Sequence, residues 1–193
     1  MTTTAAATPA AEERYSAVAI ALHWIIALAL AWQLSLGFGM ESLPRADRGA
    51  AMGVHKALGI TILVLSLARL AWRLTHKPPP LPAGMPALDR ALSSAVHVGF
   101  YVIMIGAPLG GWAMSSASTR AGPISFWGLF DVPKLPLPKS DALAGQLYVG
   151  HAAAGYLALL LIALHIAGVV KHMFGDGRDV LWRMVPGLDR PSS

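Results

Sequence analysis

Four long apolar stretches limit what this 193-residue chain can fold into. They cover about residues 17–40, 52–74, 91–114 and 145–170, and none of them contains Asp or Glu. A helix of roughly 20 apolar residues crosses the hydrocarbon core of a bilayer. With 55% hydrophobic and only 13% charged residues, the chain also has the composition of a polytopic membrane protein. The sequence therefore predicts an all-α integral membrane protein, a bundle of four transmembrane helices.

The rest of the chain consists of connections and two tails. We expect a disordered N-terminal tail over residues 1–13, one membrane domain over 14–187 and a C-terminal tail over 188–193. The first apolar stretch is too long for the core of a signal peptide, and no A-x-A site follows it, so we expect it to remain in the membrane. The segment 115–144 is rich in proline, has no obvious secondary structure, and is expected to cover one face of the bundle.

Basic residues indicate how the bundle is oriented, because positive charge is enriched in cytoplasmic loops. Four spans place both termini on one side of the membrane. That side has nine basic residues: Arg14, Arg69, Arg73, Lys77, Arg90, Lys171, Arg178, Arg183 and Arg190. The opposite side has six: Arg45, Arg48, Lys56, Arg120, Lys134 and Lys139. We therefore expect both termini in the cytoplasm. The outer side is still net basic, since only four acidic residues oppose its cations: Glu41, Asp47, Asp131 and Asp141.

Four histidines in the spans form two pairs at matched depths. His151 and His165 are fourteen residues apart, which on one helix separates them by roughly 21 Å along the axis and places them on nearly the same face. His23 lies six residues after the start of the first span, roughly 9 Å deep, and His165 lies at a similar depth from the same side. His55 and His151 lie near the outer starts of their spans. We predict an inner pair, His23 with His165, and an outer pair, His55 with His151.

Two imidazoles at one depth suit the axial coordination of a haem iron. The porphyrin supplies four nitrogens, and two histidines complete an electron-transferring centre with no open position. Zinc is a poorer alternative, because neither depth offers the three or four ligands that it needs. The chain has no cysteine, which excludes iron–sulfur clusters and covalently attached haem. The other interpretation is that these histidines form hydrogen bonds between helices. Four of them at two matched depths favour two haems over that interpretation.

Other polar residues near these depths have more than one interpretation. His97, in the third span near the inner level, can replace an inner ligand, bind a quinone carbonyl or a haem propionate, or form an interhelical hydrogen bond. Arg69 and Arg73 lie where the propionates of an inner haem would end, and Lys56 is adjacent to an outer ligand. Pairing with a propionate and snorkelling to lipid phosphate account for these three cations equally well.

The order and spacing of these motifs resemble the bacterial cytochrome b561 family of four-helix, dihaem membrane cytochromes. The matching stretches are RYSAVAIALHW at 14–24, HKALGITILVLSLARLAWRL at 55–74, HVGFYVIMIGAPLGGW at 97–112, H-x13-H at 151–165 and HMFGDGRDVLWRMVPG at 172–187. The resemblance implies a multi-pass protein of the bacterial inner membrane that binds two haems b. It assigns their iron ligands to His23, His55, His151 and His165.

Members of the family pass electrons to or from the quinone pool, and one branch oxidises superoxide at the outer face and reduces ubiquinone. By resemblance, we expect a superoxide oxidase-type oxidoreductase with ubiquinone as the acceptor, and the net basic outer surface suits capture of a small anion. The alternative is an electron-transfer subunit, similar to the cytochrome b subunits of nickel–iron hydrogenases, that docks a periplasmic oxidoreductase. A haem-free structural or transport bundle would instead be colourless. The expected partners are lipid, quinone and the electron donor, and no nucleic acid.

Overall fold

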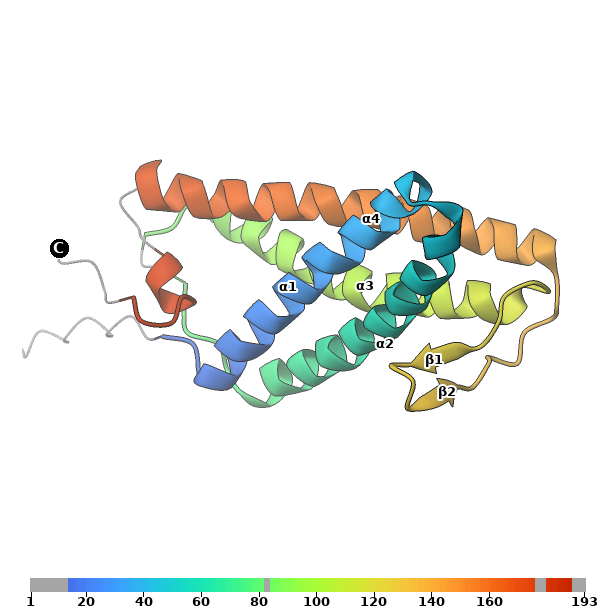
Figure 1. Cartoon of the computed structure of the whole chain (residues 1–193). Helices are drawn as coiled ribbons and strands as arrows, with labels where there is room; N and C mark the ends of the chain where they lie inside the picture. Colours follow the sequence, from blue (N-terminus) through green and yellow to red (C-terminus); the bar gives the residue numbers. More distant parts are fainter. Residues whose placement is uncertain (1–13, 82–83, 176–179, 189–193) are drawn as a thin grey trace, which may run out of the picture.

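The computed structural model describes residues 14–81, 84–175 and 180–188, most of which belong to four long helices (Figure 1). These are α1 (Ala17–Gly39), α2 (Arg45–Thr75), α3 (Ala87–Ala117) and α4 (Asp141–Val170). All four are long and apolar enough to cross a membrane, so the predicted fold class is confirmed. The two predicted tails lie outside the described residues except for Leu188. We call the end of the bundle at which α1 begins and α4 ends the termini side, and the opposite end the loop side.

Helix α1 begins where its apolar stretch begins, whereas α2, α3 and α4 each begin several residues before theirs. Pro44 precedes α2 and Pro86 precedes α3, and each of these helices carries an aspartate in its first turn. Ser140 precedes α4, and its Oγ accepts a hydrogen bond from the Leu143 N–H at 3.2 Å. Acidic residues and side-chain caps stabilise the free N–H groups of a helix start. Apolar length therefore predicts the apolar part of each helix, while α2, α3 and α4 extend beyond it at their N-terminal ends.

Neighbouring helices in the chain pack against each other: α1 on α2, α2 on α3 and α3 on α4. A buried apolar cluster joins the first three of these helices, and its members are Ile26, Leu58, Ile62 and Met104. Helix α3 continues through Pro108, which membrane-spanning helices tolerate. The close backbone contacts of α4 are with α3. Among the described residues, α4 consequently meets α1 and α2 mainly through its side chains.

The connection between α3 and α4 contains a β-hairpin that the sequence did not predict. Strand β1 (Ile124–Phe126) pairs antiparallel with β2 (Phe130–Val132). Trp127 and Gly128 in the turn have φ angles of 53° and 78°, and the Leu129 N–H donates to the Phe126 carbonyl at 2.9 Å. Positive φ at both positions matches the twist of the flanking strands. The strands are too short for an alternating pattern to identify them.

The C-terminal segment covers the termini side of the bundle. Helix α4 continues into a π-helical turn, η2 (Lys171–Gly175), and a short 3-10 helix, η3 (Leu181–Arg183), follows. The indole Nε1 of Trp24 donates to the Met184 carbonyl at 2.7 Å, and the Arg183 guanidinium donates to the Pro80 carbonyl at 2.8 Å. These bonds join the C-terminal segment to α1 and to the connection between α2 and α3. On the loop side, η1 (Met40–Ser42) extends α1.

Candidate functional site

On the loop side, α2 and α4 bring His55 and His151 together. The centroids of the two imidazole rings are 6.0 Å apart, with an interplanar angle of 82°. The Nδ1 of His151 lies 2.9 Å from the Ala107 carbonyl. A bond to a carbonyl requires a proton on Nδ1 and leaves Nε2 unprotonated, which is the form that ligates a metal. His151 is therefore already oriented as a ligand would be.

His55 and Gln33 form one hydrogen bond with each other, and each has one further buried polar atom without a partner among the described residues. The Nε2 of His55 is 3.2 Å from the Nε2 of Gln33. The Nδ1 of His55 and the Oε1 of Gln33 are the two unpaired atoms. Buried polar groups in proteins normally have a partner, and each exception requires an explanation. These unpaired atoms beside His151 are consistent with a site for a group that the protein alone does not supply.

Two glycines make room for the loop-side imidazoles. A Cβ atom at Gly37 would lie 3.4 Å from Cε1 of His55, and one at Gly111 would lie 3.1 Å from Cε1 of His151. The backbones of α1 and α3 therefore approach the edges of these rings. Sequence reasoning missed both glycines. Nothing in the sequence separates them from Gly53 or Gly106, beside which a Cβ would meet no atom within 4 Å.

On the termini side, α1 and α4 bring His23 and His165 together, with ring centroids 6.2 Å apart. The ring of His97 in α3 lies 5.5 Å from that of His165. The Nδ1 of His97 is 2.6 Å from the Ser93 carbonyl of its own helix, so this nitrogen is used within α3 rather than between helices. The structure thus brings together both pairs that depth matching predicts, and places a third imidazole beside the inner pair.

The two arginines of α2 differ in their surroundings. The guanidinium of Arg69 is half-buried and donates to the Ala19 carbonyl of α1 at 3.0 Å. Arg73, one turn further along α2, is exposed. Snorkelling to lipid therefore describes Arg73 well but does not account for Arg69, whose side chain is directed between helices toward the termini-side histidines.

The chemistry of these residues fits a haem better than a bare metal ion. Within the part of the chain that the structure describes, no group of three or more His, Cys, Asp or Glu side chains is arranged to hold a metal ion. A tetrahedral zinc site needs three or four protein ligands. A haem iron needs only two, because the porphyrin supplies the others. Pairs of facing imidazoles on separate helices meet that need.

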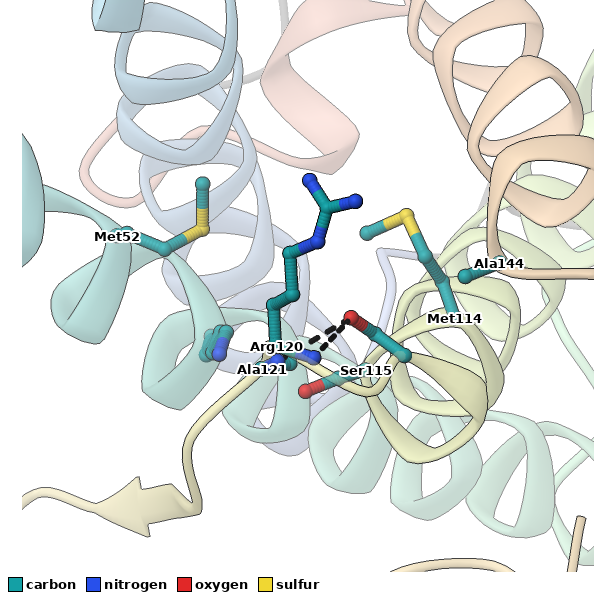
Figure 2. A pocket seen from close by; sticks show the side chains of 8 residues that line it. Met52, Met114, Ser115, Arg120, Ala121 and Ala144 are labelled. Atoms are coloured by element: carbon teal, nitrogen blue, oxygen red, sulfur yellow. Dashed lines mark hydrogen bonds between the residues drawn. The ribbon is translucent and has the colours of Figure 1, made fainter. Parts of the chain in front are cut away.

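A basic pocket of about 390 Å³ lies on the loop side between α2, α3 and the hairpin connection (Figure 2). Its cations are Lys56, which follows His55 in the chain, and Arg120. Figure 2 shows the Arg120 side chain extending between Met52 and Met114. The Oγ of Ser115, in the pocket lining, is buried and has no hydrogen-bond partner among the described residues. The Nε of Arg120 also lies 3.4 Å from Oδ2 of Asp141, so the positive charge of the pocket comes from Lys56 and from an arginine that is already paired with one carboxylate.

Two further lysines strengthen the positive charge around this pocket. The ammonium of Lys134 donates to the Ala121 carbonyl at 2.8 Å, and that of Lys139 donates to the Ser116 carbonyl at 2.7 Å. The pKa of Lys139 is lower than that of an ordinary lysine. The main cause is partial desolvation, and the second cause is repulsion from Lys134. Lys139 therefore loses its charge at a lower pH than an ordinary lysine, and the loop side becomes less positive as the pH rises.

Comparisons with known proteins identify the family of the chain. The model of the prokaryotic cytochrome b561 family matches residues 14–187. The chain is also 32% identical to cytochrome b561 homolog 2 of Escherichia coli (strain K12) over 178 residues, which cover 90% of this chain and 92% of that protein. The matched region contains both histidine pairs and the basic pocket.

Proposed function

Because the chain belongs to the prokaryotic cytochrome b561 family, we propose that it binds two haems b and carries electrons between a donor on the loop side and quinone in the membrane. Family membership makes the chain a multi-pass cytochrome b of the bacterial inner membrane that functions in electron transfer. The count of two haems rests on one observation. Two imidazole pairs, with ring centroids 6.0 and 6.2 Å apart, lie at different depths of one bundle.

We assign His55 and His151 to the loop-side haem and His23 and His165 to the termini-side haem. When bound, haem b supplies a one-electron carrier at each position. The protein's part is to hold the ligands. The Ala107 carbonyl fixes the tautomer of His151, and helix α4 sets the spacing of the two sites because it contributes one ligand to each. Bis-histidine ligation leaves no iron position for a substrate, which suits electron transfer.

Three further residues are proposed to contact the termini-side haem. Arg69 and Arg73 match the carboxylates of its propionates in charge, and guanidinium binds carboxylate through paired hydrogen bonds. His97 lies beside His165, with Nδ1 donating to the Ser93 carbonyl, so that only its imidazolium form, with Nε2 also protonated, would donate to a propionate or a quinone carbonyl. A change of Arg69 is expected to alter haem retention more than a change of the exposed Arg73.

We propose superoxide as the donor and ubiquinone as the acceptor, with the loop side facing the periplasm. Two superoxide anions each lose one electron and become dioxygen, while one ubiquinone gains two electrons and two protons and becomes ubiquinol. Lys56, one of the two cations of the basic pocket, directly follows the proposed loop-side ligand His55 in the chain. Positive charge raises the local concentration of a small anion within about one Debye length, roughly 10 Å at 0.1 M salt.

Charge variants at two ionic strengths test the donor. Replacing Arg120 by Gln is expected to slow superoxide-dependent reduction of ubiquinone several-fold at low salt and to have little effect at high salt, because salt screens the lost attraction. Arg90→Gln, a change of an exposed arginine on the termini side, serves as the control and should leave the rate unchanged. An Arg120→Gln rate equal to that of the unchanged protein at both ionic strengths would contradict electrostatic capture.

The alternative function is that of a subunit that docks a periplasmic oxidoreductase. The same basic surface supports it, because an acidic protein surface would be attracted as well as a small anion. The two functions predict different behaviour of the isolated chain. Turnover of superoxide and ubiquinone by the purified protein supports the enzyme. No turnover, together with stoichiometric co-purification of a redox partner, supports the docking subunit.

A further inference from the structure

The turn of the loop-side hairpin is apolar and exposed. Residues 126–130, which we call the hairpin tip, have the sequence FWGLF. Leu129 is 76% exposed, Phe130 57% and Trp127 44%. Exposing large apolar side chains together on a tight turn is unfavourable in water. The tip therefore requires a covering partner.

The position of the tip indicates what this partner is. The indole Nε1 of Trp127 donates to Oγ1 of Thr61 at 2.9 Å, and the rings of Trp127 and Trp32 are 6.4 Å apart. Thr61 belongs to the uncharged segment of α2 between Lys56 and Arg69, roughly 8 Å from the first and 12 Å from the second along the axis. Figure 1 shows the hairpin beside α2, with its turn directed toward the termini side. The tip thus lies alongside a membrane-spanning part of α2.

The polarity of the hairpin changes directly behind the tip. Ser125 and Asp131 face each other across the two strands, and both are exposed. Ile124 and Val132, one residue further back, are buried. The hairpin therefore has an apolar end, a polar pair behind it and a base packed on the protein. This order matches a segment that enters a bilayer from its surface.

We propose that this hairpin is a re-entrant element, and that acyl chains of the loop-side leaflet cover Phe126–Phe130. The tip continues the lipid-facing surface of the spans, where Trp32 and Val64 are 50% and 57% exposed. Its backbone groups are partly paired by the strand ladder and by the bond from Leu129 to Phe126, which reduces the cost of placing them in lipid. Trp127 has the amphipathic ring that favours the region near the headgroups. The proposal does not depend on the haem assignment.

Site-directed spin labelling tests the proposal directly, because the chain has no cysteine of its own. The protein is reconstituted in phosphatidylcholine vesicles with a nitroxide on a single introduced cysteine, Leu129→Cys. Collisions with dioxygen, which dissolves in lipid, are compared with collisions with a nickel chelate, which stays in water. Val64→Cys is the lipid-facing control, and Arg45→Cys, at the exposed start of α2, is the water-facing control.

The expected result is that the Leu129 label collides with dioxygen as often as the Val64 label and is several-fold less accessible to nickel than the Arg45 label. An Asp131→Cys label should give an intermediate value. A Leu129 label as accessible to nickel as Arg45 would place the tip in water and overturn the proposal. Low accessibility to both reagents would show protein rather than lipid over the tip, and would also overturn it. Phe130→Cys gives a second reading of the same tip if Leu129→Cys fails to fold.

Discussion

His151 is held by two neighbours from the same helix of the bundle. Its Nδ1 bonds to the Ala107 carbonyl, and its Cε1 faces the Cα of Gly111. Both residues belong to α3, one turn apart. The carbonyl fixes the tautomer of the imidazole, and the glycine leaves space for its ring. A histidine held in this way has little freedom to turn, which is what a metal ligand requires.

Adding one methyl group at Gly111 should disturb this residue. The new Cβ of Gly111→Ala would lie 3.1 Å from Cε1 of His151, and overpacking of this kind costs typically about 1–3 kcal/mol. We expect a lower thermal midpoint and weaker haem retention in detergent. Gly110→Ala is the matched control, since a Cβ there meets nothing within 4 Å. Equal behaviour of the two variants would show that the His151 ring does not need the space.

Removing single histidines should separate the two pairs. His151→Ala and His165→Ala are each expected to bind one haem instead of two, because each removes one axial ligand from one site. His76→Ala should still bind two, since His76 stacks on Trp72 with ring centroids 3.7 Å apart, away from both pairs. The haem content per chain, measured after purification, checks this. If His97→Ala loses a haem and His23→Ala keeps both, the axial ligand of the termini-side haem is His97 and not His23.

The turn conformation of the hairpin depends on glycine at position 128. Gly128 has a φ of 78°, and a side chain in this region costs about 1–2 kcal/mol. Gly128→Ala should therefore speed hydrogen exchange of the amides in residues 124–132 with little effect on the four helices. Gly122→Ala, at a position with open space around it, is the control. The same exchange rates in both variants would mean that the turn is not under this constraint.

The four helices could be predicted from the sequence and the hairpin could not. Apolar length marks a membrane span even without an alignment, and the four-span topology together with helix rise pairs His55 with His151 and His23 with His165. The hairpin has strands of three residues, and its turn uses Trp127, a residue that rarely adopts positive φ. The roles of Gln33, Gly37 and Gly111 depend on which helix faces which. That information comes from packing between helices and is absent from local sequence patterns.

At the scale of the whole molecule, the distribution of basic residues predicts the orientation. The termini side carries nine of the fifteen Lys and Arg residues, which favours the cytoplasm. A green fluorescent protein fused to the C-terminus should therefore fluoresce, and alkaline phosphatase fused at the same point should be inactive. An active phosphatase and a dark fluorescent protein would show that the C-terminus lies in the periplasm. The basic pocket would then lie on the cytoplasmic side.

The number of haems b that each chain binds tests the assignment of all four histidines at once. The purified protein should be examined as a pyridine haemochrome, with oxidised and dithionite-reduced spectra recorded on the same sample and the protein concentration determined independently. We predict two haems b per chain, both low-spin with bis-histidine spectra. One haem per chain would mean that one of the two histidine pairs is not a ligand pair. A chain without haem, from cells able to make it, would contradict the assignment of all four histidines.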